Sequence, residues 1–426
     1  MQNKSLNNLS NYYLYYVLML IFFGVFILYS KHDVGNDSSL SDWLINYSGG
    51  FVRRGLIGQI VIEFSNFFSF KLRDSILIFQ VFSFTIYYSL VFLFLRKMIT
   101  NRLIVLTIFS PIFILYPIAE IEAFGRKEII IFLLIILYFL SNITNLITQL
   151  IFKLIVFPFS TLIWEPIIIF YPYLFLADLV SFEINRFNKN FIYLFLSYLV
   201  VFLTVIFIYL NPFPIENFKT MTNVLANDFG ETCYMSCSFV GNQSENSLSE
   251  LINKQVAMMQ PSYFIRYILI IVIGFFPLFN LLRISKLNNT NLFFFSKFSN
   301  LFYPFAFAFL PSLFLYILMY DWGRIVHISY TFMLLSYFFL LKNNCINIDK
   351  EKLEKNIFIN LSNKKFIFLF IIFCFCWNPK TVMRGDIATN SLYKIVYNSS
   401  KKIFGFEGIR LFQNSPIIKF HEKIFE

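Results

Sequence analysis

Long apolar segments separated by short polar connections follow one another along most of the chain, from Tyr12 to Trp377. Most of them have about 17–20 residues, the length that a helix needs to cross a hydrocarbon core of about 30 Å. A transmembrane β-barrel would alternate polar and apolar residues, whereas the stretch from Ile129 to Leu137 is apolar throughout. The pattern therefore predicts an all-α, polytopic integral membrane protein with about 10–12 transmembrane helices. The expected spans are residues 12–30, 76–95, 103–119, 129–147, 191–210, 263–282, 301–319, 325–341 and 366–378.

A further apolar interval, residues 154–180, is too long for one upright span and short for two. Trp164-Glu165-Pro166 interrupts it in the middle, and a proline disrupts helical hydrogen bonding. We predict a broken or re-entrant pair of helices whose tip carries Glu165. Irregular backbone at that depth needs protein or a wet cavity around it.

The composition agrees with this class, because 58% of the residues are hydrophobic and only 14% are charged. The formal net charge is +11, and the basic residues lie mostly in short connections between spans. The positive-inside rule and anionic lipids account for most of this excess, so no nucleic acid is expected as a partner. The N-terminus is then expected in the cytoplasm, with residues 12–30 as an uncleaved signal anchor. The cations assigned to the cytoplasmic side are Lys4, Arg96, Lys97, Arg102, Lys153, Arg186, Lys189, Arg283, Lys286, Lys297 and the lysines of the segment 342–365.

The same alternation divides the chain into a membrane domain, residues 1–378, and an extracytoplasmic C-terminal tail, residues 379–426. The membrane domain includes an interfacial helix at about 55–70 and a periplasmic loop at about 211–262. That loop contains Cys233 and Cys237, and an outer compartment permits a disulfide between them. Two free thiols on one helical turn are the alternative.

Unusual polar clusters gather in the connections on the predicted outer side. Ionisable groups near membrane depth are costly and usually face a cavity or a partner, so these clusters are the candidates for chemistry. They are the segment Ser41–Gly55 with Asp42, Arg53 and Arg54, the segment Glu120–Glu128 with Arg126, the tip Trp164-Glu165-Pro166, and the segment Asp321–His327 with Arg324.

The first cluster combines a flexible turn with paired cations. Gly49-Gly50 permits a tight turn, and Arg53-Arg54 precede a segment whose apolar residues recur with helical spacing. Cations at a helix N-terminus are unfavourable for the helix dipole, so another group should hold them. A diphosphate is a natural candidate because guanidinium groups bind phosphate bidentately. The alternative is that both arginines rest on lipid headgroups.

The fourth cluster places Asp321, Arg324 and His327 at positions i, i+3 and i+6, on one face of a helix that enters the membrane. His327 can take a proton from a hydroxyl near neutral pH, and Asp321 either orients it or holds Arg324. A structural Asp321–Arg324 pair beside a packed histidine is the alternative.

The remaining clusters leave two interpretations open. Glu165 is either a general base or the partner of Arg53, Arg54 or Arg126, because an unpaired carboxylate at that depth would be expensive. Arg126 and Asp42 are either part of a substrate site or ordinary charges at helix ends. Arginines, carboxylates and a histidine around one lipid-accessible site would suit chemistry on a sugar linked to a polyisoprenyl phosphate.

On these residues and on its hydropathy layout, the chain resembles bacterial O-antigen polymerases and, more loosely, GT-C-type glycosyltransferases. The resemblance implies transfer of a growing glycan from an undecaprenyl diphosphate carrier to the next lipid-linked repeat unit. It implies that Arg53, Arg54, Arg126 and Arg324 bind the substrate and that His327 is the acceptor-side base. The location implied is the bacterial inner membrane, with a site that faces the periplasm.

Two other functions stay open on the sequence. A GT-C-type enzyme would use Asp42 as its base, often with a divalent metal, and a lipid-linked glycan flippase would carry charges along several spans. The chain has no phosphate-binding Gly-Lys-Ser/Thr loop, dinucleotide glycine motif or His-Glu-x-x-His motif, so we expect no cofactor and no metal. The expected partners are the undecaprenyl-diphosphate-linked glycan and membrane lipids, with a chain-length regulator as a further candidate.

Overall fold

The protein is an all-α polytopic membrane protein. The computed structural model describes residues 2–33, 38–141, 146–184, 186–245, 248–288, 298 and 300–383. The predicted cytoplasmic cation Lys297 and the tail from residue 384 onward lie outside these residues. Five described helices are long and apolar enough to cross a membrane: α1 (Gln2–Lys31), α4 (Leu72–Leu95), α10 (Lys189–Leu210), α14 (Pro261–Ile284) and α17 (Trp322–Lys342).

Shorter helices complete the bundle. The expected span 129–147 appears as a helix that ends at Leu140, and the last expected span begins earlier than predicted, at Asn363. The shorter apolar elements are α3 (Gly55–Phe68), α5 (Arg102–Ile108), α6 (Tyr116–Ala119), α7 (Glu128–Leu140), α8 (Leu146–Ile163), α9 (Tyr171–Ser181), α15 (Phe302–Phe309), α16 (Leu315–Leu318) and α20 (Asn363–Phe375).

Two of the expected spans are not continuous α-helices. The interval 103–119 divides into α5, a series of turns that includes Pro111, and α6. The interval 301–319 divides into α15, the 3-10 helix η4 (Leu310–Phe314) and α16, with Pro311 at the start of η4. Proline removes a backbone donor and clashes with the preceding turn, which explains both interruptions. An apolar run of sufficient length was therefore not enough to predict an uninterrupted helix.

The interval 154–180 is broken where the sequence predicts. Helix α8 ends at Ile163, Trp164 is extended, and the 3-10 helix η3 (Glu165–Phe170) follows before α9 begins. Helix α10 packs against α8. The break places Glu165 at one end of the helical bundle.

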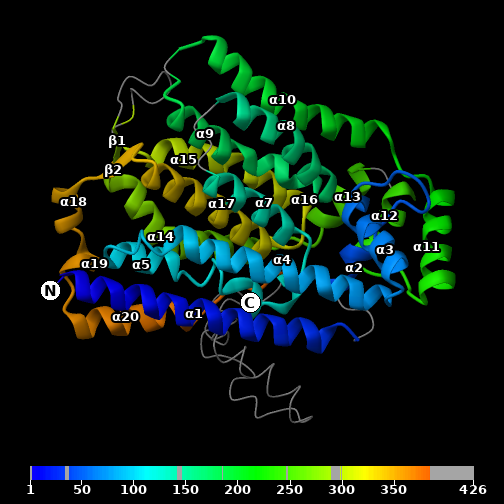
Figure 1. The fold of residues 1–426 in the computed structure, drawn as a ribbon, viewed down its shortest axis with the longest axis horizontal. Coiled ribbons are helices and arrows are strands. Elements are labelled where there is room, and N and C mark those ends of the chain that lie inside the picture. The colour runs from blue at the N-terminus through cyan, green and yellow to red at the C-terminus, as the bar shows by residue number, and fades with distance from the viewer. Residues whose placement is uncertain are drawn as a thin grey trace.

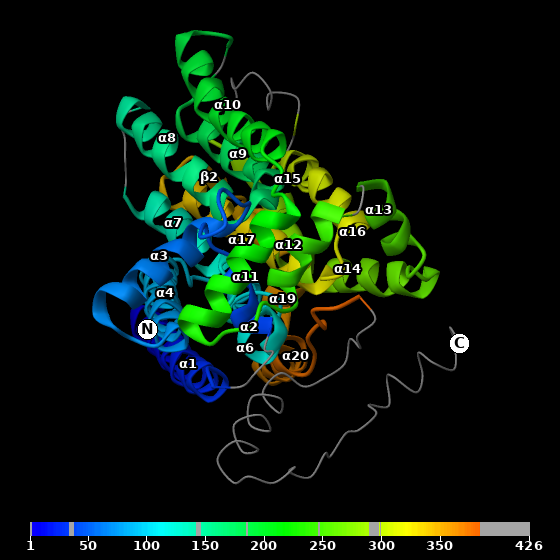
Figure 2. The same ribbon diagram turned by 90° about the vertical axis from the view of Figure 1, so that its right-hand side faces the viewer.

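Several of the shorter elements lie at the two ends of the bundle (Figure 1). One end, which we call the polar end, holds α2 (Ser38–Ser41), α3 and the helices of the predicted loop, α11 (Ile215–Phe229), α12 (Ser236–Glu245) and α13 (Leu248–Val256). The opposite end holds the antiparallel strands β1 (Ser285–Leu287) and β2 (Ile346–Ile348) with α18 (Lys350–Glu354) and α19 (Ile357–Asn360). Figure 2, viewed along the bundle, shows α11, α12 and α2 in front of the longer helices.

The centre of the bundle is α17. Its side chains from Trp322 to Leu340 are all buried, whereas α10 exposes large apolar residues such as Phe202 and Leu210. A helix with an exposed apolar side suits contact with lipid, and a helix buried on all sides suits the interior of a membrane bundle. The polar residues that open α17 are therefore held against the rest of the protein.

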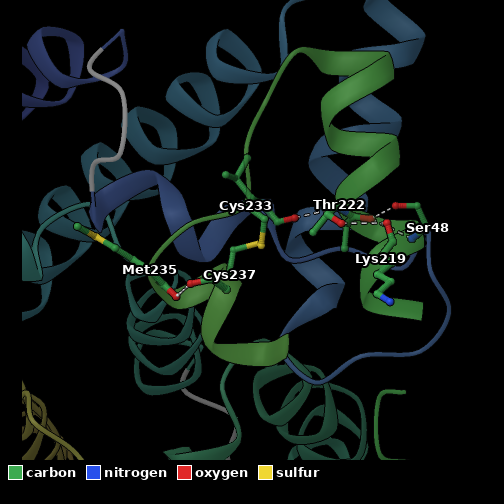
Figure 3. Close-up of a disulfide and its surroundings, with 9 residues drawn as sticks. Ser48, Lys219, Thr222, Cys233, Met235 and Cys237 are labelled. Atoms are coloured by element: carbon green, nitrogen blue, oxygen red, sulfur yellow. Dashed lines mark hydrogen bonds between the residues drawn. A yellow bond between two sulfur atoms is a disulfide. The ribbon is translucent and has the colours of Figure 1, made fainter. Parts of the chain in front are cut away.

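The predicted loop 211–262 is folded and tied to the bundle. Cys233 and Cys237 form a disulfide, so the thiol alternative is not what the structure contains (Figure 3). Arg73, in the first turn of α4, binds Glu231 through two parallel contacts, Nε to Oε1 at 2.6 Å and Nη2 to Oε2 at 2.9 Å. A bidentate pair of this kind fixes both position and orientation.

The turn at Gly49-Gly50 also contacts the loop. The Gly50 amide donates to the Tyr47 carbonyl at 2.9 Å, which closes the predicted tight turn. A Cβ on Gly49 would lie 2.0 Å from the Asn217 carbonyl oxygen of α11, so only glycine permits this approach. Figure 3 shows Ser48 beside Lys219 and Thr222 of the same helix. The first polar segment and the loop therefore form one surface.

One predicted cytoplasmic cation is placed wrongly by the sequence analysis. Lys153 is not in a connection: it lies within α8, is completely buried, and forms an ion pair with Asp178 of α9. The hydroxyls of Tyr138 on α7 and Tyr198 on α10 donate to the same carboxylate at 2.5 Å each. Lys153 and these three partners come from four different helices, so the residues next to Lys153 in the sequence do not reveal them.

Candidate functional site

The four polar clusters of the sequence meet at the polar end. Glu165 receives both guanidinium groups of the first cluster: Arg54 binds it in a fork, with Nε to Oε2 and Nη2 to Oε1 both at 2.7 Å. Arg53 Nη1 lies 3.3 Å from Oε1. Glu165 is thus the partner of Arg53 and Arg54, which is one of the two interpretations that the sequence left open.

Local backbone geometry aims these side chains. Arg54 has φ +62°, a left-handed conformation that ends the preceding turn immediately before α3 begins at Gly55. Glu165 is presented by the break after Trp164, at the first position of η3. The Arg53 side chain is 27% exposed and that of Glu165 is 18% exposed. This end of the fork is therefore open to a ligand.

Arg126 joins the other clusters. Its Nη1 donates to Asp42 Oδ2 at 3.0 Å and to Ser236 Oγ at 3.2 Å, and its Nη2 lies 4.0 Å from Asp321 Oδ2. Burial alone would raise the pKa of Asp42, but the positive charges around it, Arg126 first, hold that pKa well below its usual value. Asp42 is therefore ionised and a weak proton acceptor in this arrangement.

Arg324 continues the network toward the bundle. Its Nη1 lies 3.0 Å from Asp321 Oδ2, and its Nη2 lies 3.5 Å from Glu128 Oε1. The guanidinium also lies over the Trp164 ring, 5.6 Å from the ring centre. Asp321 therefore holds Arg324, the second of the two roles considered for it.

His327 lies one turn deeper and has a different partner from the one first considered. Its Nδ1 is 2.9 Å from the Ile112 carbonyl oxygen, which can only accept, so Nδ1 carries the hydrogen. The ring stacks on Tyr116 at 5.1 Å and meets the Phe132 ring edge-on at 5.6 Å. The Ile112 backbone, rather than Asp321, orients this histidine, and Nε2 of the neutral ring is left as the basic nitrogen.

A small cavity lies beneath the network, between α4, α7, α17 and the segment 114–126. Its volume is about 30 Å³, which suits one or two water molecules and excludes a sugar ring. The polar residues that line it are Gln80, Tyr87, Tyr88, Arg126, Glu128, Arg324 and His327. His327 and Glu128 thus border the same small cavity.

Several residues of the site were not singled out from the sequence. Lys127 Nζ donates to the Arg54 carbonyl at 2.7 Å, and burial lowers the pKa of Lys127 to about 7. Gln80 Nε2 donates to the carbonyls of Gly125 at 2.8 Å and Ser39 at 2.9 Å, which fixes the turn before Arg126. A glutamine within an apolar helix was the available signal for Gln80.

The beginning of the C-terminal tail crosses this end of the bundle. The Glu120 carboxylate accepts from the Thr381 amide at 3.1 Å and lies 3.6 Å from Lys380 Nζ. The Gly323 amide donates to the Thr381 carbonyl at 3.0 Å, and a Cβ on Gly323 would lie 1.9 Å from the Lys380 carbonyl oxygen. We call residues 378–383 the strap, because they hold the segment that begins α17.

Comparison with known protein families, curated proteins and solved structures finds no match. Within the described ranges, no group of three or more His, Cys, Asp or Glu side chains is placed to hold a metal ion. The chemistry of the site must therefore be inferred from its own geometry.

Proposed function

We propose that the chain is a glycan polymerase that transfers a glycan from an undecaprenyl diphosphate carrier to the next lipid-linked repeat unit. The observation that carries this proposal is the convergence of cations from distant segments on one partly open site. These cations are Arg53, Arg54, Arg126, Lys127 and Arg324. Guanidinium and ammonium groups in this density suit a diphosphate, whose charge grows as it leaves.

The charge balance supports an anionic ligand. When Lys127 is protonated, the cations outnumber by one the carboxylates in contact with them, which are Asp42, Glu128, Glu165 and Asp321. The weakest of the short contacts at the open edge is that of Arg53, at 3.3 Å from Glu165. A diphosphate could therefore bind Arg53 at this edge while Arg54 keeps its fork to Glu165.

The neighbouring helix α3 supports a lipid-linked substrate. Its last turn exposes the aromatic side chains of Phe67, at 81%, and Phe68, at 50%, although α3 begins next to the arginines. Exposed aromatic residues at the end of a partly buried helix suit the membrane interface. A polyprenyl chain attached to a diphosphate at Arg53 would therefore remain in lipid.

The proposed reaction is a displacement at the anomeric carbon of the donor sugar. The arginines stabilise the diphosphate that leaves, and a base accepts the proton of the acceptor hydroxyl. Two groups on the cavity can accept this proton: His327, which the sequence analysis favours, and Glu128. We propose that the site faces the periplasm of a bacterial inner membrane, which agrees with the disulfide between Cys233 and Cys237.

Purified protein with a synthetic undecaprenyl-diphosphate-linked repeat unit tests the proposal. We expect a ladder of products that differ by whole repeat units, without any nucleotide sugar. Transfer of a single sugar from a polyprenyl phosphate would instead support the GT-C-type alternative. Transfer of intact carrier between leaflets of proteoliposomes, with no new glycosidic bond, would support a flippase.

The proposed orientation has a separate test in intact cells. A cysteine at Ser48, at the polar end, should react with an impermeant thiol reagent, and a cysteine at Asn343, at the opposite end, should not. Removal of the native free thiols Cys345, Cys374 and Cys376 provides the background. Labelling at Asn343 alone would contradict a periplasmic site.

A further inference from the structure

We propose that Glu128 is the catalytic base that accepts the proton of the acceptor hydroxyl, an inference that rests on the proposed glycan transfer. Glu128 opens helix α7 and is only 6% exposed. Its Oε1 faces Arg324 Nη2 at 3.5 Å, whereas its Oε2 is buried without any hydrogen-bond partner among the described residues. In the sequence, Glu128 is only the last residue of the polar segment Glu120–Glu128, which is either part of a site or an ordinary charged helix end.

The unpartnered oxygen points to a ligand. A buried carboxylate oxygen that accepts no hydrogen bond is costly, so native structures keep such an atom where water or substrate supplies the donor. Glu128 lines the cavity beneath the network, together with Tyr87, whose hydroxyl is also buried and has no hydrogen-bond partner within the described ranges. The cavity has room for one or two water molecules, or for the edge of one hydroxyl group.

Position along the helices distinguishes Glu128 from His327. Glu128 contacts Arg324 in the first turn of α17, and His327 lies three residues deeper on the same helix. A sugar hydroxyl that approaches from the side of Arg53 meets the level of Arg324 and Glu128 before it reaches His327. His327 is therefore placed to hold a water molecule behind the reacting hydroxyl, and Glu128 is placed to touch that hydroxyl.

The step balances as a displacement with proton transfer. The acceptor oxygen forms a bond to the anomeric carbon while the bond from that carbon to the diphosphate oxygen breaks. The diphosphate leaves with the electron pair, and the hydroxyl proton moves to Oε2 of Glu128. Water in the cavity then takes this proton, which restores the carboxylate for the next transfer.

Glu128→Gln tests the inference because it keeps the size of the side chain and its contact with Arg324 but removes the base. We expect kcat to fall by about 10²–10⁴-fold with KM for the lipid-linked acceptor nearly unchanged. Glu216→Gln, an exposed glutamate of α11, is the matched control and should retain wild-type kinetics. His327→Gln should lose less kcat than Glu128→Gln, about tenfold or less.

A second measurement separates a base from a structural residue. An acceptor whose reacting hydroxyl is acidified by a neighbouring fluorine needs less help to lose its proton, so it should recover part of the activity of Glu128→Gln. A structural defect would depress both acceptors equally, and that result would overturn the inference, as would a larger loss in His327→Gln. If the wild-type protein makes no polymer from either acceptor, the proposed function itself fails.

Discussion

Two groups of buried charges in this protein differ in how completely their hydrogen bonds are satisfied. Lys153 and Asp178 are both fully buried, and the carboxylate accepts from Lys153, Tyr138 and Tyr198. Gln149 Oε1 also lies 3.4 Å from Lys153 Nζ. The charged network at the polar end, in contrast, keeps Arg53 partly exposed and leaves Glu128 Oε2 and Arg324 Nε without hydrogen-bond partners in the part of the chain that the structure describes.

The degree of hydrogen-bond saturation separates structural from functional charges in the membrane bundle. A saturated ion pair has no capacity left for a ligand, and its benefit lies in specifying which helices pack together. Lys153 lies roughly 18 Å along the helix from the level of Glu165, so it does not belong to the same site. The unsaturated network can still bind, and this capacity makes it the candidate site. A transporter would need charged groups along its spans that can bind a substrate. The Lys153–Asp178 pair gives this alternative little support, because its groups already bind one another and two tyrosines.

The largest effect on activity should come from Arg53 and Arg54. Replacing both by alanine should lower glycan transfer by more than about 10³-fold, because the diphosphate loses its bidentate partners. Lysine at either position keeps the charge but loses the planar fork, so it should already impair transfer. Lys219→Ala, an exposed cation of α11, is the control, and polymerisation is measured with purified protein. Full activity of the double alanine variant would remove these residues from the mechanism.

The largest effect on stability should come from the saturated pair. Lys153→Met leaves Asp178 buried and unpaired, which should reduce the free energy of unfolding by about 3–5 kcal/mol. The double variant Lys153→Met with Asp178→Leu should recover most of that loss and should polymerise glycan normally. Denaturant unfolding in detergent and the polymerisation assay measure the two properties. A stable but inactive double variant would show that the Lys153–Asp178 pair takes part in function, and the distinction between a structural pair and a functional network would then be wrong.

A smaller effect is expected at Asp42. Asp42→Asn keeps a partner for Arg126 but removes a charge, so activity should fall by about tenfold or less. Chelators should leave the wild-type rate unchanged. If Asp42 proves indispensable and a divalent metal restores chelated enzyme, the GT-C-type mechanism replaces the polymerase. Metal titration of the chelated enzyme gives the decisive measurement.

The smallest effect should be a pH dependence of carrier binding. Because burial lowers the pKa of Lys127 to about 7, its amine is charged below that pH and neutral above it. A bound diphosphate favours the charged amine, so affinity for undecaprenyl diphosphate should fall by about fivefold or less between pH 6 and pH 8. Lys127→Met should bind more weakly at pH 6 and lose this slope. An identical slope in both proteins would assign the titration to the carrier itself.

The sequence predicted the features that local patterns encode. The long helices α1, α4, α10, α14 and α17 coincide with long apolar runs, and Pro166 accounts for the break at Glu165. The arginine pair also lies where expected, directly before α3. These features depend on residues that are close together in the chain.

The remaining features depend on distant contacts. Arg54 and Glu165 are 111 residues apart, and Lys153 finds its carboxylate 25 residues later on another helix. The sequence cannot show that Glu128 Oε2 lacks a hydrogen-bond partner among the described residues, because this depends on where all the surrounding donors lie in the fold. Which polar groups form hydrogen bonds, and which do not, is decided by the folded structure.

The strap has a consequence for the timing of synthesis. Residues 320–323 receive hydrogen bonds from, or donate them to, Thr381 and Met383, about sixty residues later in the chain. The ribosome therefore delivers every cation of the network long before it delivers the segment that secures the start of α17. A nascent chain that stops short of residue 378 carries an unfinished site, and the protein gains its final arrangement only when nearly all of its membrane helices have been made.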